Sequence, residues 1–314
     1  MEAVVAEPAA HLVELCNLTH NSATNKYSMR FFNKSSLDIF LVLYAIIGFS
    51  LPFLISTFNP IFWLILTPFQ IVFIVVVMNT SMHHHTHVPI FKSTKLNRIY
   101  EIFVSMTTSI PFQLWKYLHL THHRFNNDKK KDGVVKDPLS FYRYGKDNER
   151  ENFWSYVVLG LYRDFSGESS RDTLETCSTK FDLKEIDKLK IEKMFIMLYF
   201  LTILVVSWTY FIYYVLVVLL TLFANNANSY GEHYLATDHA NFRCDSIGSY
   251  GKLFNFLCFN SGYHQEHHVK PSLHWTRLSE LTHTLPDSRK TINGLYIFNA
   301  PLLDDFKLLF RKNK

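Results

Sequence analysis

The sequence is poor in cysteine, and two long stretches lack positive charge altogether. Its 314 residues include four cysteines, no two of which form a C-x-x-C pair. This spacing argues against a disulfide framework, a thiolate metal site and a rubredoxin-like centre. No basic segment precedes an apolar one at the N-terminus, so we expect no signal peptide. The net charge of +5 suits a cytosolic membrane face and favours acidic partners, and we expect no nucleic-acid partner.

Lysine and arginine are missing from residues 35–91 and from residues 194–242, although the chain contains 32 of them. These two windows hold the longest apolar runs. Because ~20 apolar residues are needed to cross the hydrocarbon layer, such runs predict membrane-spanning helices. Charged segments flank both windows, and the positive-inside rule places all four flanks in the cytosol, so each window crosses an even number of times. We therefore predict an all-α integral membrane protein with four spans in two hairpins, at about residues 37–58, 61–79, 194–207 and 210–226.

The segments outside these spans form the predicted cytosolic part. Residues 1–36 are expected to be a cytosolic N-terminal segment, and residues 37–314 a single membrane domain with a helical cap. Asn59-Pro60 marks a turn in the first hairpin. The second hairpin is expected to bend near residues 207–210. Both termini should then face the cytosol.

Histidines gather in three clusters that follow the apolar runs or lie in the cytosolic segments. The clusters read "HHHTH" from residue 83, "HLTHH" from residue 119 and "HQEHH" from residue 264. Residues three and four apart lie on one face of a helix, and imidazole is the commonest side-chain metal ligand. The histidines that we predict to bind metal are His83, His87, His119, His122, His123, His233, His264, His267 and His268.

Nine histidines exceed what one metal ion can use, so we predict two metal ions. Imidazole suits iron, copper, zinc and nickel. We expect no carboxylate ligand, which leaves the metals with high positive charge and with open positions for dioxygen or water. His84 and His85 are expected to support the site or to be exposed. The lone His239, His274 and His283 are expected to be polar surface groups.

Metal-bound histidines usually donate their second N–H to a carboxylate or a carbonyl. Several polar residues near the clusters are candidates for this supporting role, although a solvated surface position is as consistent with the sequence for each carboxylate. The candidates are Asp128, Asp137, Asn228, Ser229, Glu232 and Glu266.

The order H-x-x-x-H, H-x-x-H-H, lone histidine, H-x-x-H-H resembles the membrane fatty acid desaturase superfamily, which also contains alkane, fatty acyl and carotenoid hydroxylases. The resemblance runs from the first span to about Trp275. "NSYGEHYL" is also similar to the Asn-Tyr-x-Glu-His-Tyr-Gly element of the alkane hydroxylases. In acyl-CoA desaturases an asparagine four residues before the lone histidine helps to hold a water near one metal, and Ser229 stands at that position here.

The resemblance implies a non-haem di-iron centre held by histidine alone, above a stalk of four helices. Such a centre uses dioxygen to remove hydrogen from an unactivated methylene of a fatty acyl substrate, carried as a free acid, acyl-CoA, acyl-carrier protein or lipid. We predict desaturation. The alternatives are hydroxylation and oxidative decarboxylation to a terminal alkene. Pro111, Phe112 and Trp115 could line an acyl tunnel, or else would serve plain packing or anchor the chain at the membrane interface.

The electrons are expected to come from a separate acidic protein such as a ferredoxin, a rubredoxin or cytochrome b5. The basic segments 129–131 and 184–193 could attract it, or could instead bind anionic lipid headgroups. A histidine-rich metal transporter is a competing hypothesis, but transporter sites lie near the bilayer midplane and these clusters lie beyond the apolar runs. A sterol-type hydroxylase would keep the enzyme class and change the substrate.

Overall fold

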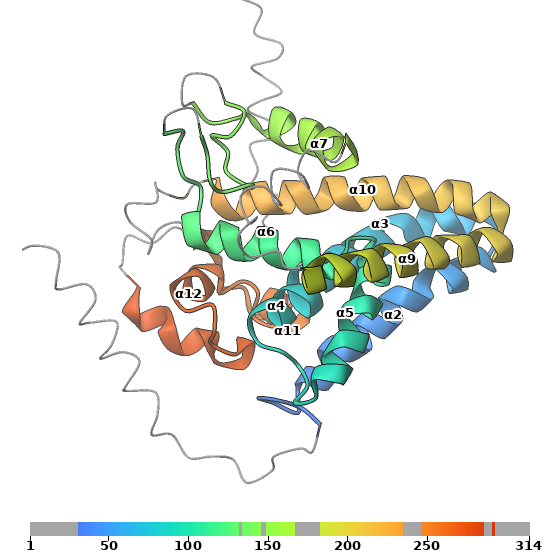
Figure 1. The fold of residues 1–314 in the computed structure, drawn as a ribbon, viewed down its shortest axis with the longest axis horizontal. Helices are drawn as coiled ribbons and strands as arrows, with labels where there is room; N and C mark the ends of the chain where they lie inside the picture. Colours follow the sequence, from blue (N-terminus) through green and yellow to red (C-terminus); the bar gives the residue numbers. More distant parts are fainter. Residues whose placement is uncertain are drawn as a thin grey trace, which may run out of the picture.

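The computed structural model describes residues 31–131, 134–145, 149–166, 183–234, 236, 246–285 and 291–292. Most of them are helical (Figure 1), as the sequence predicts. The elements are α2 (Asp38–Ser56), α3 (Pro60–Val77), the π-helix η1 (Met78–Met82), α4 (His83–His87), α5 (Thr94–Thr108), α6 (Phe112–Phe125), the π-helix η3 (Ser155–Leu159), α7 (Gly160–Ser166), α9 (Leu183–Val206), α10 (Trp208–His233), α11 (Lys252–Leu257), α12 (His264–Val269), the 3₁₀ helix η5 (Trp275–Thr284), and the parallel strands β1 (Gly248–Ser249) and β2 (Thr291–Ile292).

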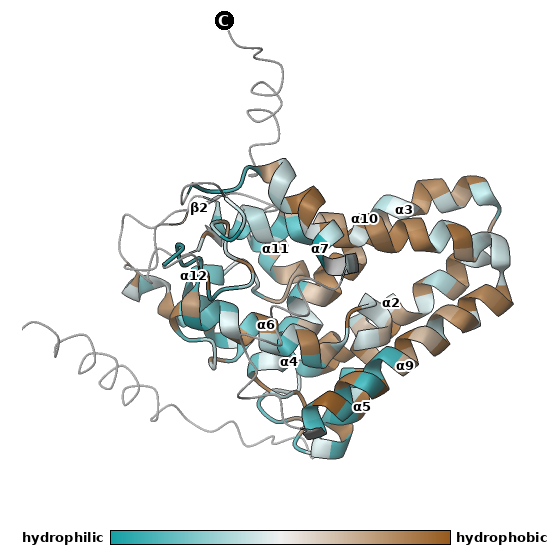
Figure 2. Cartoon of the chain, turned by 45° about the horizontal axis from the view of Figure 1, so that its top comes forward, coloured by the Kyte–Doolittle hydropathy of each residue, from teal (hydrophilic) through white to brown (hydrophobic). Residues whose placement is uncertain are grey.

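Four long helices, α2, α3, α9 and α10, form a bundle that extends away from the short histidine-bearing helices (Figure 1). α3 contacts both α2 and α10, and α9 contacts α10 and α5. Inside the bundle, the ring of Trp63 packs on that of Tyr210 with centroids 5.1 Å apart. Outside it, large apolar side chains are exposed, among them Leu64 at 62% and Val205 at 85%. Figure 2 shows that hydrophobic residues predominate along these helices, and exposed apolar side chains of this size are stable against lipid rather than water.

Within the described part of the chain, three helical segments are long and apolar enough to cross a bilayer: 38–56, 60–87 and 208–233. This supports an integral membrane protein. α9 is not among them because its first half is charged, and its uncharged part, from residue 194 to Val206, is short. The arrangement of four spans in two hairpins therefore stays a prediction.

The two turns at the far end of the bundle follow from local polar residues. Asn59 caps α3 by accepting a hydrogen bond from the Ile61 N–H at 3.2 Å, and Pro60 occupies the first helical position, where its missing donor costs nothing. Ser207 is extended and caps α10 by accepting from the Tyr210 N–H at 3.3 Å. The chain thus reverses at the places where the sequence predicts turns.

A π-helical turn, η1, joins α3 to α4 without ending the helix. The His83 N–H bonds to the carbonyl of Met78, five residues back. The Asn79 amide donates to the Val75 carbonyl at 2.9 Å. Because an α-helix turns by about 100° per residue, the extra residue moves all later side chains around the helix axis. The first histidine cluster owes its direction to this turn, which the sequence did not predict.

The start of α2 is tied to the C-terminal part of the histidine region. The Asp38 carboxylate is buried and accepts from the Trp275 indole N–H at 2.8 Å, and its Oδ1 lies 2.9 Å from His274 Nε2. The expectation that His274 is a surface group is therefore wrong, because a buried carboxylate partners it. Of the predicted N-terminal segment, residues 1–30 lie outside the described residues, and the domain division stays a prediction.

Candidate metal centre

Four helices bring the three histidine clusters and the lone histidine to one place. The first cluster forms α4, directly after the π-turn, and the second lies in the last two turns of α6. The third forms α12, and His233 is the last residue of α10. On α6, spacings of three and four residues place the imidazoles of His119, His122 and His123 on neighbouring positions near the C-terminal end of the helix. All nine predicted histidines are thus brought together.

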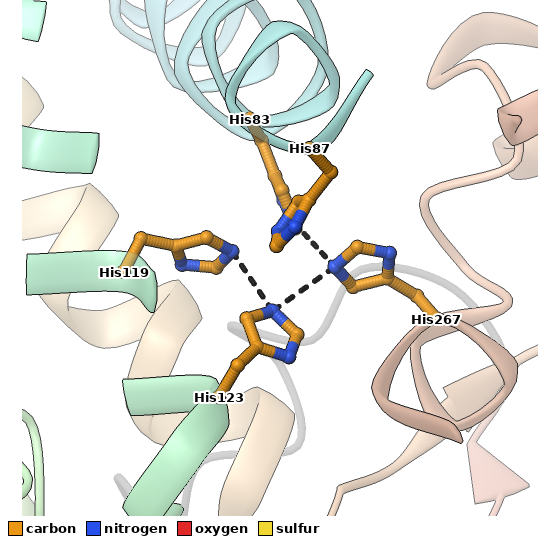
Figure 3. A group of neighbouring side chains, drawn as sticks. All are labelled: His83, His87, His119, His123 and His267. Atoms are coloured by element: carbon orange, nitrogen blue, oxygen red, sulfur yellow. Dashed lines mark hydrogen bonds between the residues drawn. The ribbon is translucent and has the colours of Figure 1, made fainter. Parts of the chain in front are cut away.

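Five imidazoles make up the first histidine group, in which α4, α6 and α12 each contribute side chains (Figure 3). Its Nε2 atoms converge. His83 Nε2 lies 2.8 Å from His267 Nε2, and His123 Nε2 lies 3.1 Å from the same atom. His119 Nε2 is 3.0 Å from His123 Nε2. The members of this group are His83, His87, His119, His123 and His267.

The second histidine group is built around His233. His122 Nε2 and His264 Nε2 lie 3.2 Å and 3.3 Å from His233 Nε2. His268 and His122 converge with His233 on one side, and His264 and Glu232 converge with it on the other. The two groups adjoin, since the ring centroids of His123 and His268 are 4.3 Å apart.

The chemistry of these donors fits a pair of metal ions. Metal–nitrogen bonds of ~2.1 Å place two ligands of one ion roughly 3–4 Å apart, and the distances above lie in or near this range. Burial, and then the neighbouring histidines, lower the pKa of His119, His123 and His267 well below the ordinary 6.5. These imidazoles are therefore neutral, with lone pairs available. His87 Nε2 is buried without a hydrogen-bond partner among the described residues, as suits a metal ligand.

Comparison with known proteins adds a family to this geometry. A family model described as fatty acid desaturase matches residues 58–298. The chain belongs to the fatty acid desaturase family. A sphingolipid delta(4)-desaturase of Schizosaccharomyces pombe (strain 972 / ATCC 24843) is 23% identical over 225 residues, which cover 66% of this chain and 57% of that protein. The chain thus spans little more than half the length of this curated relative. No solved structure matches the chain.

Membership of the desaturase family confirms the resemblance seen in the histidine order, and together with the apolar helices it supports a membrane protein. It also speaks against the metal-transporter alternative. The family does not by itself assign roles to the residues around the two histidine groups. The contacts of each of these residues indicate its role.

Asp137 contacts His122 of the second group on the side of the ring that faces away from His233. Its Oδ2 lies 2.9 Å from His122 Nδ1, on the side of the ring opposite the nitrogen that faces His233. Burial raises the pKa of Asp137, but His122 and the N–H donors of Asn127 and Leu139 together outweigh this and hold it below the ordinary 3.8. An ionised carboxylate here fixes the imidazole tautomer that leaves Nε2 free to bind a metal.

The other predicted supporting residues differ in what they contact. Asp128 accepts from the backbone N–H groups of Lys136 and Asp137 and thus shapes the loop that carries Asp137. Glu266 is buried but accepts from the Thr282 hydroxyl at 2.6 Å and from the Tyr250 hydroxyl at 3.4 Å, so it holds α12 to its neighbours instead. The remaining three lie on the last turns of α10. There the Asn228 amide donates to the Glu232 carboxylate at 2.9 Å, and Ser229 is half-buried.

His84 and His85 are buried outside both groups. His84 Nε2 lies 3.2 Å from the carbonyl oxygen of Phe259, and His85 Nδ1 accepts from the Ile90 N–H at 3.1 Å. They hold α4 in place. Neither is exposed, and a role in supporting the metal ligands stays a prediction. Of the lone histidines, His283 is exposed as predicted, and His239 lies outside the described residues.

The residues predicted to line a tunnel have other surroundings. Phe112 is 1% exposed and belongs to a hydrophobic core with Tyr100 and Val104. Trp115 lies parallel to the ring of His119, with centroids 5.6 Å apart, and Pro111 precedes α6 as its N-cap. None of the three lines either cavity described next. Phe112 is thus a packing residue, which leaves the predicted tunnel role without support.

Two cavities border the histidine groups, and sequence reasoning identified neither. One lies beside the first group and is lined by residues that include His87, His267 and Trp275. The other, of about 70 Å³, lies between α3 and α10. Valines of α3 and Phe254 form its apolar part, and its polar part ends at Asn228 and Glu232. It lies between two apolar helices and reaches Glu232 at the edge of the second group.

We expect Asp137→Asn to weaken metal binding without preventing folding. The amide cannot provide the negative charge that orients His122, and residues that support metal ligands in this way typically contribute ~10–100-fold in affinity. Metal retained after dialysis against a chelator measures the effect. Asp187→Asn, on an exposed part of α9, is the control and should retain metal like the unmodified protein. Equal retention in both variants would show that Asp137 has no such role.

Proposed function

We propose that this chain is an oxygen-dependent desaturase that binds two iron ions in the two histidine groups and introduces a double bond into a fatty acyl chain. The observation that carries this proposal is the convergence of nine imidazoles in two adjoining groups, seven of them buried and those of His87 and His123 partly buried. It occurs in a chain of the fatty acid desaturase family. A bound iron pair would supply the reaction of dioxygen with an unactivated C–H bond. Imidazole donors suit iron, as they also suit copper, zinc and nickel, and the choice of iron here rests on the desaturase family.

The proposed reaction removes two hydrogens from neighbouring methylenes. Dioxygen is reduced to two waters, using the two hydrogens of the substrate and two electrons and two protons from a donor. The chain's own part is to hold the metal ligands, exclude water and align the acyl chain. Burial of the histidines serves the first two tasks, and the cavity between α3 and α10 serves the third.

The relative from fission yeast is a sphingolipid delta(4)-desaturase by its printed name. Together with the apolar lining of the cavity between α3 and α10, this supports a long-chain acyl or acyl-derived substrate. The carrier of that chain is left to experiment. Hydroxylation and decarboxylation are outcomes of the same test, because the histidine groups suit all three reactions.

Incubation with saturated acyl substrates under labelled dioxygen tests the proposal. Desaturation sends the label into water and leaves a product two mass units lighter. A product that has gained one labelled oxygen would identify a hydroxylase. A product one carbon shorter with a terminal alkene would identify a decarboxylase. Protein lacking iron, prepared by chelation and otherwise identical, is the control and should give no product.

We expect a substitution that fills the cavity to reduce activity on long acyl chains and to leave iron binding unchanged. Val76 lines the apolar part of the cavity, so Val76→Phe takes up space that the chain needs. Because a mismatch of one or a few methylenes changes specificity by ~10–200-fold, we expect about tenfold lower kcat/KM, with shorter chains less affected. Val215→Phe, on the partly exposed side of α10, is the matched control. Equal loss for all chain lengths would contradict the assigned route.

We further propose that the histidine groups and both termini face the cytosol. The two turns at Asn59 and Ser207 lie at the same end of the bundle, as the contact between Trp63 and Tyr210 shows, and the histidines lie at the other end (Figure 1). A single cysteine at Asn59 or at Thr209, in a chain whose four native cysteines are replaced, should be labelled from the non-cytosolic side. Both positions are exposed. Labelling of both from the cytosol would refute this orientation.

A separate acidic protein, such as a ferredoxin, a rubredoxin or cytochrome b5, is the proposed electron donor. The first half of α9 presents Lys184, Lys190 and Lys193 to its surroundings, and all three are exposed. A positively charged face accelerates association with an acidic partner, and it does so less at high salt. Electron transfer that slows with increasing salt would support this site.

A further inference from the structure

The two histidine groups are unequal. The first contains five imidazoles, whereas the second contains four and has a carboxylate, Glu232, at its edge. We propose that Glu232 is the fifth protein ligand of the metal ion in the second group. This rests on the proposed di-iron function and departs from a centre held by histidine alone.

The geometry of Glu232 supports a ligand role. The residue is 8% exposed and immediately precedes His233 at the end of α10. Its Oε1 accepts from the Asn228 amide at 2.9 Å, which fixes the carboxylate, and its Oε2 lies 3.7 Å from His264 Nε2. This distance lies within the roughly 3–4 Å that separates two ligands of one metal ion. Asn228 thus orients the group, and the second oxygen remains directed at the metal position.

The other buried carboxylates near the histidines do not share this arrangement. Asp137 contacts the far nitrogen of the His122 ring, so the imidazole stands between it and the metal position. Glu266 lies on α12 among the third cluster, yet its oxygens accept from Thr282 and Tyr250. Within the described residues, Glu232 is the carboxylate whose oxygen converges with two of the nine imidazoles, those of His233 and His264.

A carboxylate ligand would make the two metal positions electronically different. Five neutral imidazoles leave the full charge of the first ion uncompensated, whereas Glu232 would reduce the net charge of the second site by one. An anionic ligand stabilises the higher oxidation state of its metal. Glu232 and Asn228 also line the cavity between α3 and α10. The charge-compensated position is therefore the one that borders the proposed substrate route.

Iron content and Mössbauer spectra of protein loaded with ⁵⁷Fe test this inference without depending on activity. The unmodified protein should hold two irons per chain and show two quadrupole doublets of equal area. Glu232→Ala should lose the doublet of the second site and fall toward one iron. Glu232→Gln has nearly the same shape but no charge, so it should change that doublet and leave the other unaltered. Glu280→Gln, at an exposed carboxylate of η5 that belongs to neither group, is the control and should keep both doublets.

Two irons with both doublets unchanged in Glu232→Gln and in Glu232→Ala would overturn the inference. If the alanine variant fails to fold, the glutamine variant decides alone, because its side chain fills the same space and can still accept from Asn228. Fewer than two irons in the unmodified protein would count against the proposed di-iron function itself. The two failures are thereby distinguished.

Discussion

Replacing His123 or His268 by alanine should abolish the proposed desaturation and lower the iron content of the purified protein. His123 Nε2 lies within 3.1 Å of two other Nε2 atoms of the first group, so its loss opens the middle of that group. His268 converges with His122 and His233 in the second group, so its loss removes one side of that group. Removing a residue that only supports a ligand already costs ~10–100-fold in metal affinity or activity. Loss of a ligand itself should therefore exceed ~100-fold in both.

The control for these variants is His283→Ala. His283 is exposed on η5, so this substitution removes one imidazole and leaves both groups intact. Its iron content and activity should match those of the unmodified protein. Iron per chain by elemental analysis, together with product formation, measures both effects. Full activity in His268→Ala would refute the assignment of the second group.

Deleting a single residue from the π-turn should have an equally large effect. Removal of Thr80 allows α3 and α4 to join as an uninterrupted α-helix. Because each residue turns the helix by about 100°, His83 and His87 would then point away from α6 and α12. We expect loss of iron from the first group, seen as a fall from two irons toward one or none. Activity should fall below detection.

Thr80→Ala separates this effect from loss of the side chain. The Thr80 hydroxyl donates to the Val76 carbonyl at 2.6 Å, and alanine removes this bond but keeps the number of residues in the turn. The substituted protein should retain most of its iron. Circular dichroism and gel filtration establish that the shortened protein remains helical and monodisperse. Two irons in the deletion variant would show that the π-turn does not set the direction of α4.

The histidine clusters were predictable because helical spacing is a local property. Spacings of three and four put His119 beside His122 and His123 whatever the rest of the chain does. The apolar runs were equally visible, since the need to satisfy backbone hydrogen bonds in lipid leaves helices as the simplest outcome. The mostly helical fold and the set of nine converging histidines therefore follow from the sequence.

Features that depend on distant contacts were not predictable in this way. His274 is buried because Asp38, 236 residues earlier, provides a partner. Glu232 and His233 are neighbours in the chain, and neighbours on a helix do not normally face one another. Their convergence becomes evident only when α12 brings His264 beside them. The sequence left Phe112 open between a tunnel role and plain packing, and its contacts with Tyr100 and Val104 of α5 favour packing.

The order in which the proposed metal ligands occur along the chain has a consequence for biosynthesis. His83 and its neighbour His267 are separated by 184 residues. During synthesis the first cluster therefore leaves the ribosome long before the third exists, and neither histidine group can be complete until α12 has been made. Contacts this distant in sequence form late in folding, and metal binding to such a site is coupled to that last step. A chain interrupted before residue 264 should accordingly insert its apolar segments yet fail to retain metal, so iron retention reports completed assembly.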